Sequence, residues 1–422
     1  MDLRDFIETD LTVEEEISAD YEISKKLFEN PDKTVLFENV YGSDFRVVGN
    51  LCPSRNRLYQ SLGTSKKDYI NHVLNAVENP IDPVVVDSGE CQEVVLDTDL
   101  TKIPILTHFR GDSGRYITSG IVIANDEESG RNVSIHRMMV LDKTRLAARL
   151  VERHLWKYHQ RAEARNEALE VAIAVGVHPA IFFASAYSVP EGYDEFKLAS
   201  SLLGKPMELV DCENVDLQVP RYAEIVMEGR ILPNERADEG PFVDITKTYD
   251  IIRKEPVIEI SRITHRKDPI YQALMPSCNE HKIFMGMPRE PSIFNSVKSV
   301  ADVKNACLTD GGCNWLHGVV SIKKTRDTDV KEVIMAAFDG HHSMKHLIIV
   351  DDDIDIFDPQ DVEYALATRF QGDEDTTMIK NVKGSSLDPS ADDGAMTTKV
   401  GLDATKSLDN PDSFKRIGLD KQ

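Results

Sequence analysis

The sequence has little of what marks secreted, membrane-spanning or zinc-binding proteins. None of its apolar runs approaches the roughly 18 residues that a membrane-spanning helix needs. The N-terminus, MDLRDFIETDLTVEEE, is acidic and lacks the apolar segment of a secretory signal. The six cysteines include no CxxC pair, the spacing typical of zinc and iron–sulfur sites. We therefore expect a cytoplasmic protein with reduced thiols.

Basic residues are also in short supply. The chain has 49 Lys and Arg against 72 Asp and Glu, so its formal net charge is −23. Such a charge repels nucleic acid and anionic membranes, and we expect neither as a partner. An anionic substrate would therefore need arginines that are concentrated in one cleft.

Glycine motifs for nucleotides are missing as well. The sequence contains neither GxGxxG nor GxxxxGK[ST] where a Rossmann or P-loop domain would need it. Instead, three patterns predict an α/β (α+β) protein with domains at residues 1–102, 103–295 and 296–422. The first region mixes helix and strand signals, and the last region contains both. The middle region is strand-rich at uneven spacing, which favours an antiparallel, barrel-like domain over a βαβ series.

The expected elements follow from apolar periodicity and turn residues. We expect strands over residues 34–37, 45–49, 117–124, 133–141, 180–185, 223–228, 257–264, 318–323 and 346–350. We expect helices over residues 12–27, 65–77, 144–175, 296–307, 330–338 and 359–369. The last helix should begin with Asp358 as its N-cap and Pro359 at its first position. After residue 370 the polar composition predicts an extended tail.

Polar residues alternate at the start of the strand that carries Asn132, Ser134, His136 and Arg137. Because successive side chains of a strand point to opposite faces, the first three share a face and Arg137 lies on the other. One strand can thus serve a cofactor phosphate on one side and a carboxylate on the other. Taken alone, the segment also fits an ordinary polar edge strand.

Two carboxylates, Glu239 and Asp244, flank a Gly-Pro turn in the segment EGPFVD. Separated in this way, they can converge on one pocket, where a carboxylic acid can serve as a proton donor. A solvated acidic turn is the alternative in a chain with 72 acids.

A metal site can be assembled from Asn132, His154 and Glu195, which offer an amide oxygen, an imidazole and a carboxylate. This ligand set favours Mn²⁺ or Mg²⁺ over zinc. No local spacing marks the site, and His154 also fits an exposed helix face. The acidic run DDDID at residues 351–355 lacks the Gly and Glu that an EF-hand loop needs, so we do not expect calcium there.

Eight short segments carry a family resemblance through their joint order and spacing. They are NVSIHR at 132–137, RH at 153–154, ASAYSVPEGYDE at 184–195, EGPFVD at 239–244, SCNEH at 277–281, KHLIIVDDDIDIFDPQDVEYALATR at 345–369, LDPS at 387–390 and GLDAT at 401–405. Together they resemble the UbiD-like decarboxylases over essentially the whole chain.

This resemblance implies three parts: an N-terminal α/β domain, a split-barrel flavin-binding domain and a C-terminal α/β domain that takes part in oligomerisation. It also implies prenylated FMN, supplied by a separate flavin prenyltransferase, with Mn²⁺ and K⁺ near the cofactor phosphate. A small unsaturated carboxylic acid is the expected substrate. We expect a homo-oligomer, either a dimer or a hexamer of dimers.

The resemblance also assigns ligands residue by residue. For Mn²⁺ it implies Asn132, His154 and Glu195, and for K⁺ it implies oxygens of Ala184, Ser185 and Tyr187, with Glu195 shared. The residues expected to bind the cofactor are Asn132, Ser134, Ile135, Arg137, Arg153, His154, Glu195 and Lys345.

The family's catalytic residues fall on Glu239, Arg137 and Asp244. The resemblance implies that the flavin acts as an electron sink, so that CO₂ leaves without a free carbanion. Arg137 would bind the substrate carboxylate with its planar fork. Glu239 would orient Arg137, and Asp244 would protonate the remaining carbon.

Two positions depart from the family pattern. Val243 stands where relatives often have Gly before the second acid. Val disfavours a positive φ and would alter the reach of Asp244. Arg153 stands where some relatives have Gln, and it adds a positive charge near the cofactor phosphate.

The substrate is the least determined feature. Length and acidic composition resemble the archaeal branch that converts trans-anhydromevalonate 5-phosphate to isopentenyl phosphate in a modified mevalonate pathway. The candidates for binding the substrate phosphate are His281, Lys282, His341, His342 and Lys345. Phe284 is the candidate for packing against a flat conjugated acid. The alternatives are a 4-hydroxybenzoate-type aromatic acid, a catalytically silent flavin-binding protein, and a Mn²⁺-dependent hydrolase without flavin.

Overall fold

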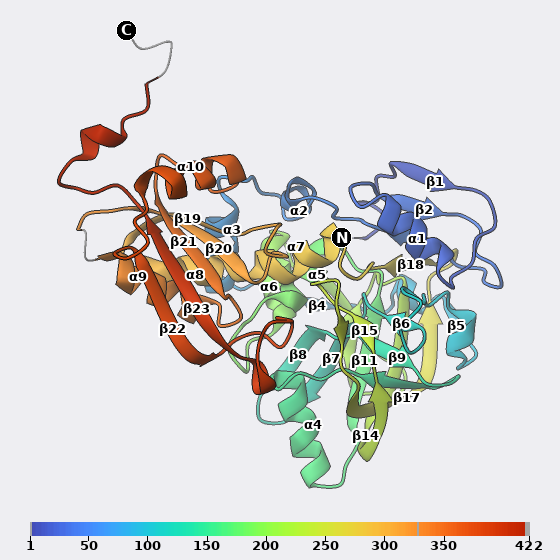
Figure 1. Cartoon of the computed structure of the whole chain (residues 1–422). Coiled ribbons are helices and arrows are strands. Elements are labelled where there is room, and N and C mark those ends of the chain that lie inside the picture. The colour runs from blue at the N-terminus through green and yellow to red at the C-terminus, as the bar shows by residue number, and fades with distance from the viewer. Residues whose placement is uncertain (1, 327–328, 418–422) are drawn as a thin grey trace. The chain divides into compact units, whose positions relative to one another are not determined.

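The computed structural model describes residues 2–326 and 329–417. The chain divides into two units, Met1–Phe284 and Met285–Gln422 (Figure 1). Helices and strands alternate along both units, so the mixed α and β class predicted from the sequence is confirmed. The predicted limits of the three domains remain predictions.

A nine-stranded sheet forms the largest part of the first unit. Its order is β6-β9-β10-β17-β14-β11-β7-β8, with β5 paired to β17. Every pairing is antiparallel, as the sequence predicts for this region. The strands are β5 Val94–Leu96, β6 Tyr116–Ile117, β7 Ile121–Asp126, β8 Gly130–Ile135, β9 Met138–Val140, β10 Arg145–Ala148, β11 Leu169–Val175, β14 Ile225–Glu239 and β17 Arg253–His265.

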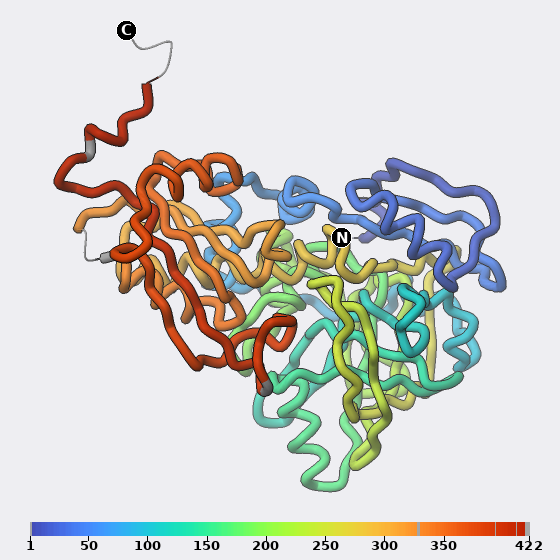
Figure 2. Tube along the Cα trace, viewed as in Figure 1, coloured from blue at the N-terminus to red at the C-terminus, as the bar shows by residue number. Residues whose placement is uncertain are grey.

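Smaller sheets complete the first unit. The order β1-β2-β3-β18 forms one sheet, β13-β12-β4 a second, and β15-β16 a hairpin. Late in the unit the chain returns to the N-terminal sheet, where β18 pairs in parallel with β3 (Figure 2). The strands are β1 Leu11–Val13, β2 Val35–Phe37, β3 Arg46–Gly49, β4 Val84–Val85, β12 Glu208–Asp211, β13 Gln218–Pro220, β15 Phe242–Val243, β16 Tyr249–Asp250 and β18 Ile270–Ala273.

Helices cover these sheets, and apolar side chains from the N-terminal and nine-stranded sheets share one core that includes Phe37, Val47, Ile173 and Ile258. The helices are α1 Glu22–Glu29, α2 Arg55–Ser61, α3 Tyr69–Glu78, α4 His154–Ala164, α5 Pro179–Ala186, α6 Glu195–Leu202 and α7 Asn279–Gly286. The last of these, α7, crosses the boundary between the units.

The second unit is built on a five-stranded sheet of order β19-β20-β21-β23-β22. Its elements are α8 Glu290–Lys298, β19 Asp302–Leu308, β20 His317–Lys323, α9 Asp329–Gly340, β21 His346–Asp351, α10 Pro359–Arg369, β22 Thr376–Lys383 and β23 Met396–Ala404. The start of α10 is as predicted, because the Asp358 carboxylate accepts the Gln360 N–H at 2.9 Å and Pro359 is the first helical residue.

Two predicted helices in the first unit are largely wrong. Residues 12–27 begin as β1, which pairs in parallel with β2, and α1 starts only at Glu22. The long helix over 144–175 is instead β10, α4 and β11. Asn166 ends the helical turn with a positive φ of 57°, and the apolar residues after it belong to a buried strand. Helix-favouring composition here was overridden by sheet pairing.

Three further expectations are corrected by the structure. Residues 180–185 form helix α5 and no strand, because Pro179 opens the helix and His178 Nδ1 caps the Ala180 N–H at 3.2 Å. In the predicted helix over 296–307, the chain leaves α8 at Lys298 and enters β19. The expected tail after residue 370 contains β22 and β23, and β23 pairs with β21 inside the sheet.

Candidate active site

Arg137 lies in the short link between β8 and β9, with only 9% of its side chain exposed. Its Nε and Nη2 donate to the two carboxylate oxygens of Glu239 at 2.8 and 2.9 Å. Its Nη1 donates to Asp244 Oδ2 at 3.0 Å, and Nη2 also donates to Asp250 Oδ2 at 2.8 Å. Burial by itself would lower the pKa of Arg137, but the hydrogen bond to Glu239 and the nearby carboxylates raise it above its ordinary value. The arginine is therefore held charged and in one orientation.

The turn after Glu239 brings both predicted acids to the same guanidinium. Glu239 is fully buried at the end of β14. Gly240 follows with a φ of +97°, and a Cβ there would lie 2.9 Å from the Ile251 carbonyl oxygen, so only Gly fits. The Gly240 N–H donates to the Tyr116 hydroxyl at 3.1 Å, which anchors the turn. The expected convergence of Glu239 and Asp244 is confirmed.

Val243 does not need the positive φ that Gly would allow. It lies in β15, where it pairs with Tyr249, and its side chain is buried. Since extended backbone suits a β-branched residue, Val fits this position without strain. The next residue, Asp244, reaches Arg137 with Val in place, and a different reach with Gly at this position stays a prediction.

Two charged residues of the site were not expected from the sequence. Asp250, in β16, lies opposite Phe242 and shares its Oδ2 between Arg137 and Arg253 Nη1, the latter at 2.7 Å. Burial would raise the pKa of Asp250, but the two arginines lower it below its ordinary value. Arg253, in β17, lies opposite Glu239 in the ladder. Register alone brings these residues together, and local sequence carries no signal for it.

A loop before β6 supports the EGPFVD segment. Asp112 accepts the Phe109 N–H at 2.8 Å and the Val243 N–H at 3.3 Å, and Ser113 Oγ donates to the Gly240 carbonyl oxygen. Burial raises the pKa of Asp112, although these N–H groups act against it. The loop thus fixes the backbone between the two predicted acids.

Two buried histidines, His108 and His281, belong to the surroundings of the EGPFVD segment: His108 packs against Phe242, and the charge of Asp244 acts on His281. His108 is buried, packs edge-on against the Phe242 ring at 6.2 Å, and has no hydrogen-bond partner for either ring nitrogen in the described structure. Burial lowers its pKa to about 3, with a further contribution from His281. Burial also lowers the pKa of His281, against the opposing charge of Asp244. Both rings are therefore neutral near pH 7.

On the opposite face of β8, a chain of hydrogen bonds joins the predicted polar residues. Asn132 Nδ2 donates to Ser134 Oγ at 2.9 Å, and Ser134 Oγ lies 2.9 Å from His136 Nε2. His136 Nδ1 lies 3.0 Å from the Arg149 carbonyl oxygen, so Nδ1 carries the proton and Nε2 accepts from Ser134. Burial lowers the pKa of His136 to about 4, which keeps the ring neutral. The predicted shared face is confirmed.

Glu195 is a buried carboxylate at the start of α6. Its Oε2 accepts the Val133 N–H at 2.8 Å, so it lies beside the Asn132 backbone. No ion pair to it occurs within the described ranges, and burial raises its pKa to about 8. His154 opens α4, and both α4 and α6 pack against β8. A buried acid without an ion pair, on a helix that packs against the same strand as Asn132 and as the helix of His154, fits a divalent cation that prefers oxygen and nitrogen ligands.

Arg153 is the cation of this face. Its Nη1 lies 3.4 Å from Ser188 Oγ, and it forms no ion pair within residues 2–326. Its side chain is exposed to solvent, and partial desolvation by the surrounding protein lowers its pKa with no carboxylate to oppose that effect. An arginine without an acid next to a helix start fits an anionic phosphate.

The other predicted residues lie in three places. Ile135 ends β8, and Ala184, Ser185 and Tyr187 lie in α5 or directly after it. Like α4 and α6, α5 packs against β8. Lys345 belongs to the second unit, where Nζ pairs with Asp388 at 2.8 Å.

The remaining substrate candidates divide between the units. His281 and Lys282 lie on α7, and Phe284 packs edge-on against Phe182 with ring centroids 4.8 Å apart. His341 and His342 follow α9 in the second unit, where His341 Nε2 lies 3.0 Å from the Trp315 carbonyl oxygen.

Two carboxylates of the acidic run at 351–355 form ion pairs with Arg369. Arg369 Nη1 lies 2.7 Å from Asp351, and its Nη2 lies 3.0 Å from Asp353. Across the described residues, no group of three or more His, Cys, Asp or Glu could hold a metal ion. The expected metal set contains only two residues of these four kinds, His154 and Glu195, because its third ligand is the amide of Asn132.

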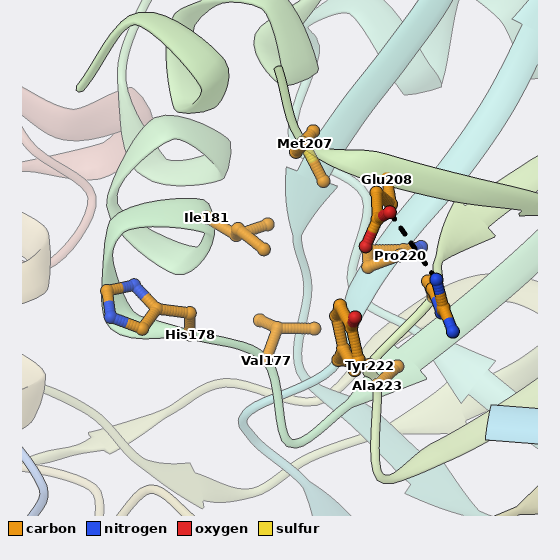
Figure 3. Close-up of a pocket in the computed structure, with 9 residues that line it drawn as sticks. Val177, His178, Ile181, Met207, Glu208, Pro220, Tyr222 and Ala223 are labelled. Carbon is orange, nitrogen blue, oxygen red and sulfur yellow. Dashed lines mark hydrogen bonds and ion pairs between the residues drawn. The ribbon is translucent and has the colours of Figure 1, made fainter. Parts of the chain in front are cut away.

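A small cavity elsewhere in the first unit does not involve the predicted residues. It lies between α5, β12 and the chain after β13, with His178, Ile181 and Met207 among its lining residues (Figure 3). Glu208 and Arg221 also line it and form a hydrogen bond of 3.4 Å. Separately, none of the helices in the described ranges is long and apolar enough to cross a membrane.

Three domain models of one family match this chain. The chain matches the 3-octaprenyl-4-hydroxybenzoate carboxy-lyase N-terminal domain at residues 8–77, the Rift-related domain at 84–278 and the C-terminal domain at 282–404. An anhydromevalonate phosphate decarboxylase of Methanothermobacter thermautotrophicus is 46% identical over 409 residues, which cover 96% of each chain. The enzyme of that name in Methanosarcina mazei is 47% identical over 405 residues, covering 96% of this chain and 94% of the relative.

Solved structures point the same way. The UbiD-class enzyme HmfF of Pelotomaculum thermopropionicum in complex with FMN superposes with a TM-score of 0.94 at 39% identity, covering 97% of this chain and 94% of that one. An evolved dimeric form of HmfF with prFMN gives a TM-score of 0.90 at 38% identity and the same coverage. Three domain matches that together span most of the chain settle its membership. The chain belongs to the UbiD family of carboxy-lyases.

Proposed function

We propose that this enzyme removes CO₂ from trans-anhydromevalonate 5-phosphate with prenylated FMN and so forms isopentenyl phosphate in a modified mevalonate pathway. The substrate is suggested by the names of the archaeal relatives, and the cofactor by the flavins of the HmfF structures. The single observation that carries the reaction type is a buried arginine fixed by one carboxylate with a second carboxylate beside it.

The cofactor would be held on the side of β8 that carries Asn132. When bound, the prenylated flavin supplies an electron sink for the carbon that loses CO₂. Asn132, His154 and Glu195 would bind Mn²⁺ at its phosphate, and Arg153 would add charge-assisted hydrogen bonds. The oxygens around Ala184, Ser185 and Tyr187 would bind K⁺, and Ser134, Ile135 and Lys345 remain expected cofactor contacts.

Arg137 would bind the substrate carboxylate. Its guanidinium keeps its charge in a buried position, and Glu239 fixes its plane through two parallel hydrogen bonds. A fixed fork costs little reorganisation when the carboxylate binds. After CO₂ has left, Glu239 still balances the charge of Arg137.

Asp244 would deliver the proton. It lies next to the arginine that binds the carboxylate, and its Oδ1 accepts the Ile245 N–H at 2.7 Å, which orients the carboxyl group. A proton donor at this position reaches the carbon from which the carboxylate has departed. Expected partners also include a flavin prenyltransferase and further copies of this chain, as a dimer or a hexamer of dimers, in the cytoplasm.

The deciding experiment measures CO₂ release by protein co-expressed with a flavin prenyltransferase. We expect turnover of trans-anhydromevalonate 5-phosphate and little or none of 4-hydroxybenzoate. Asp244→Asn should retain the flavin spectrum and lose activity by roughly 10²- to 10⁴-fold. Asp238→Asn is a matched control, because Asp238 is exposed and pairs with Lys254. A flavin-free protein that binds Mn²⁺ would instead support the hydrolase alternative.

A further inference from the structure

Asp250 occupies a part of Arg137 that the substrate carboxylate needs. Glu239 takes the side of the guanidinium that is formed by Nε and Nη2. A second carboxylate can bind in bidentate fashion, through two parallel hydrogen bonds, only at the outer edge of the guanidinium, which is formed by Nη1 and Nη2. The remaining Nη2 hydrogen already points to Asp250 Oδ2 at 2.8 Å. A bidentate substrate must therefore displace Asp250.

Asp250 can leave Arg137 without losing its other partners. The oxygen that faces Arg137 also lies 2.7 Å from Arg253 Nη1, and its second oxygen accepts the Ile251 N–H at 2.9 Å. Arg253 Nη1 donates to the Ile251 carbonyl oxygen at 3.2 Å. Arg253 is thus anchored on the far side of Asp250 and keeps it paired when Arg137 turns to another anion.

Asp244 is not equivalent to Asp250. Asp244 bonds to Nη1, which has a second hydrogen available for a substrate oxygen. Nη2 has no further hydrogen, since Glu239 takes one and Asp250 the other. Asp250 therefore occupies the outer-edge hydrogen of Nη2 that Glu239 leaves free.

We propose that Asp250 is a positioning residue that holds the outer edge of Arg137 in place of the substrate carboxylate and passes to Arg253 when the substrate binds. This inference rests on the proposed function, because it assigns the carboxylate of that substrate to Arg137. Asp250 tunes the affinity of Arg137 for the substrate carboxylate, whereas Asp244 acts in the chemical step.

The test compares variants of the flavin-loaded enzyme. In Asp250→Asn the side chain keeps its shape but binds Arg137 through a weaker, neutral oxygen, so KM for trans-anhydromevalonate 5-phosphate should fall about tenfold with kcat within about twofold. The dissociation constant of the saturated analogue, 3-methyl-5-phosphopentanoate, should fall by the same factor in calorimetry. Asp238→Asn makes the same charge change without contact to Arg137 and should leave both constants unchanged.

Arg253→Gln should change KM in the opposite direction. Asp250 then has only Arg137 as a cationic partner, so KM should rise several-fold. In the double variant with Asp250→Asn, the effect of Arg253→Gln should disappear, because the competing carboxylate is gone. Additive effects would mean that the two residues act only through their charges, and the proposal would be overturned.

The outcomes separate this inference from the proposed function. If the wild-type enzyme releases no CO₂ from the phosphorylated acid, the proposed function fails. If the wild-type enzyme is active and Asp250→Asn has the same KM as Asp238→Asn, the inference fails and the function stands. If Asp250→Asn does not fold, Arg253→Gln alone decides, and an unchanged KM in that variant overturns the inference.

Discussion

The two sides of strand β8 differ in how their charges are balanced. On one side, the single guanidinium of Arg137 is shared by three carboxylates. On the other side, the carboxylate of Glu195 and the guanidinium of Arg153 form no ion pairs within the ranges that the structure describes. The first side contains three carboxylates against the two arginines Arg137 and Arg253, and the second contains charged groups without an ion-pair partner in the described ranges.

This difference separates two tasks. Buried charges are stable only when they are paired, so an internally paired group such as Arg137 with Glu239 can stay oriented through a reaction. A buried group without an ion pair, such as Glu195, gains most from a ligand of opposite charge, whereas Arg153 is exposed and free to bind an anion. We infer that the Arg137 side performs the chemistry with the protein's own residues, and that the Glu195 side is built for a cation and a phosphate.

The largest expected effect comes from removing the shared cation. Arg137→Ala should reduce kcat/KM by at least about 10³-fold, because the substrate carboxylate loses its partner. It should also lower the free energy of unfolding by about 3–5 kcal/mol, because Glu239 is left buried without its cation. Steady-state CO₂ release and urea unfolding measure the two effects.

Arg137→Lys serves as the control for charge. It keeps the cation but loses the planar fork, so stability should largely return while activity stays low. If Arg137→Ala were as stable as the wild-type protein, the three carboxylates would not depend on Arg137, and the contrast between the two sides of β8 would be lost.

A smaller effect is expected on the opposite side. Glu195→Gln removes a buried carboxylate that forms no ion pair in the described ranges and whose pKa burial raises to about 8, so the metal-free protein should not lose stability. The stabilisation that Mn²⁺ gives the wild-type protein, about 2.7 kcal/mol at a concentration one hundred times its Kd, should disappear. Thermal unfolding with and without Mn²⁺ measures this difference.

Glu191→Gln is the matched control for that variant. Glu191 already pairs with Lys157 and Arg161, and their hydrogen bonds, together with that of Ser129, lower its pKa to about 2. The response to Mn²⁺ should therefore survive in Glu191→Gln. Equal loss of the response in both variants would contradict a specific metal role for Glu195.

The sequence predicts the parts of the site that lie close together along the chain. The alternation of Asn132, Ser134 and His136 requires only extended backbone. The predicted strand is interrupted, because β8 ends at Ile135 and β9 begins at Met138, but the three side chains are linked on one face, as expected. Glu239 and Asp244 converge because the Gly-Pro turn between them is local. In both cases, backbone geometry over a few residues fixes the outcome.

Residues that come together only through strand register could not be predicted from the sequence. Asp250 and Arg253 reach Arg137 and Glu239 only because β16 pairs with β15 and β17 pairs with β14. The same limit applies to the fold. A short apolar run such as residues 180–185 fits either a strand or a helix, and only the contacts of its neighbours decide.

The smallest effect concerns how rigidly the backbone positions Asp244 next to Arg137, and a substitution of Val243 tests it. Val243→Gly removes a buried side chain and loosens an extended residue, so the free energy of unfolding should fall by about 2–3 kcal/mol. Because Asp244 is the next residue, we expect kcat to fall by about threefold through poorer positioning. Val243→Ala loses similar packing but keeps the restriction on φ, so its kcat should match the wild type. A higher kcat in Val243→Gly would instead mean that Val243 limits the reach of Asp244.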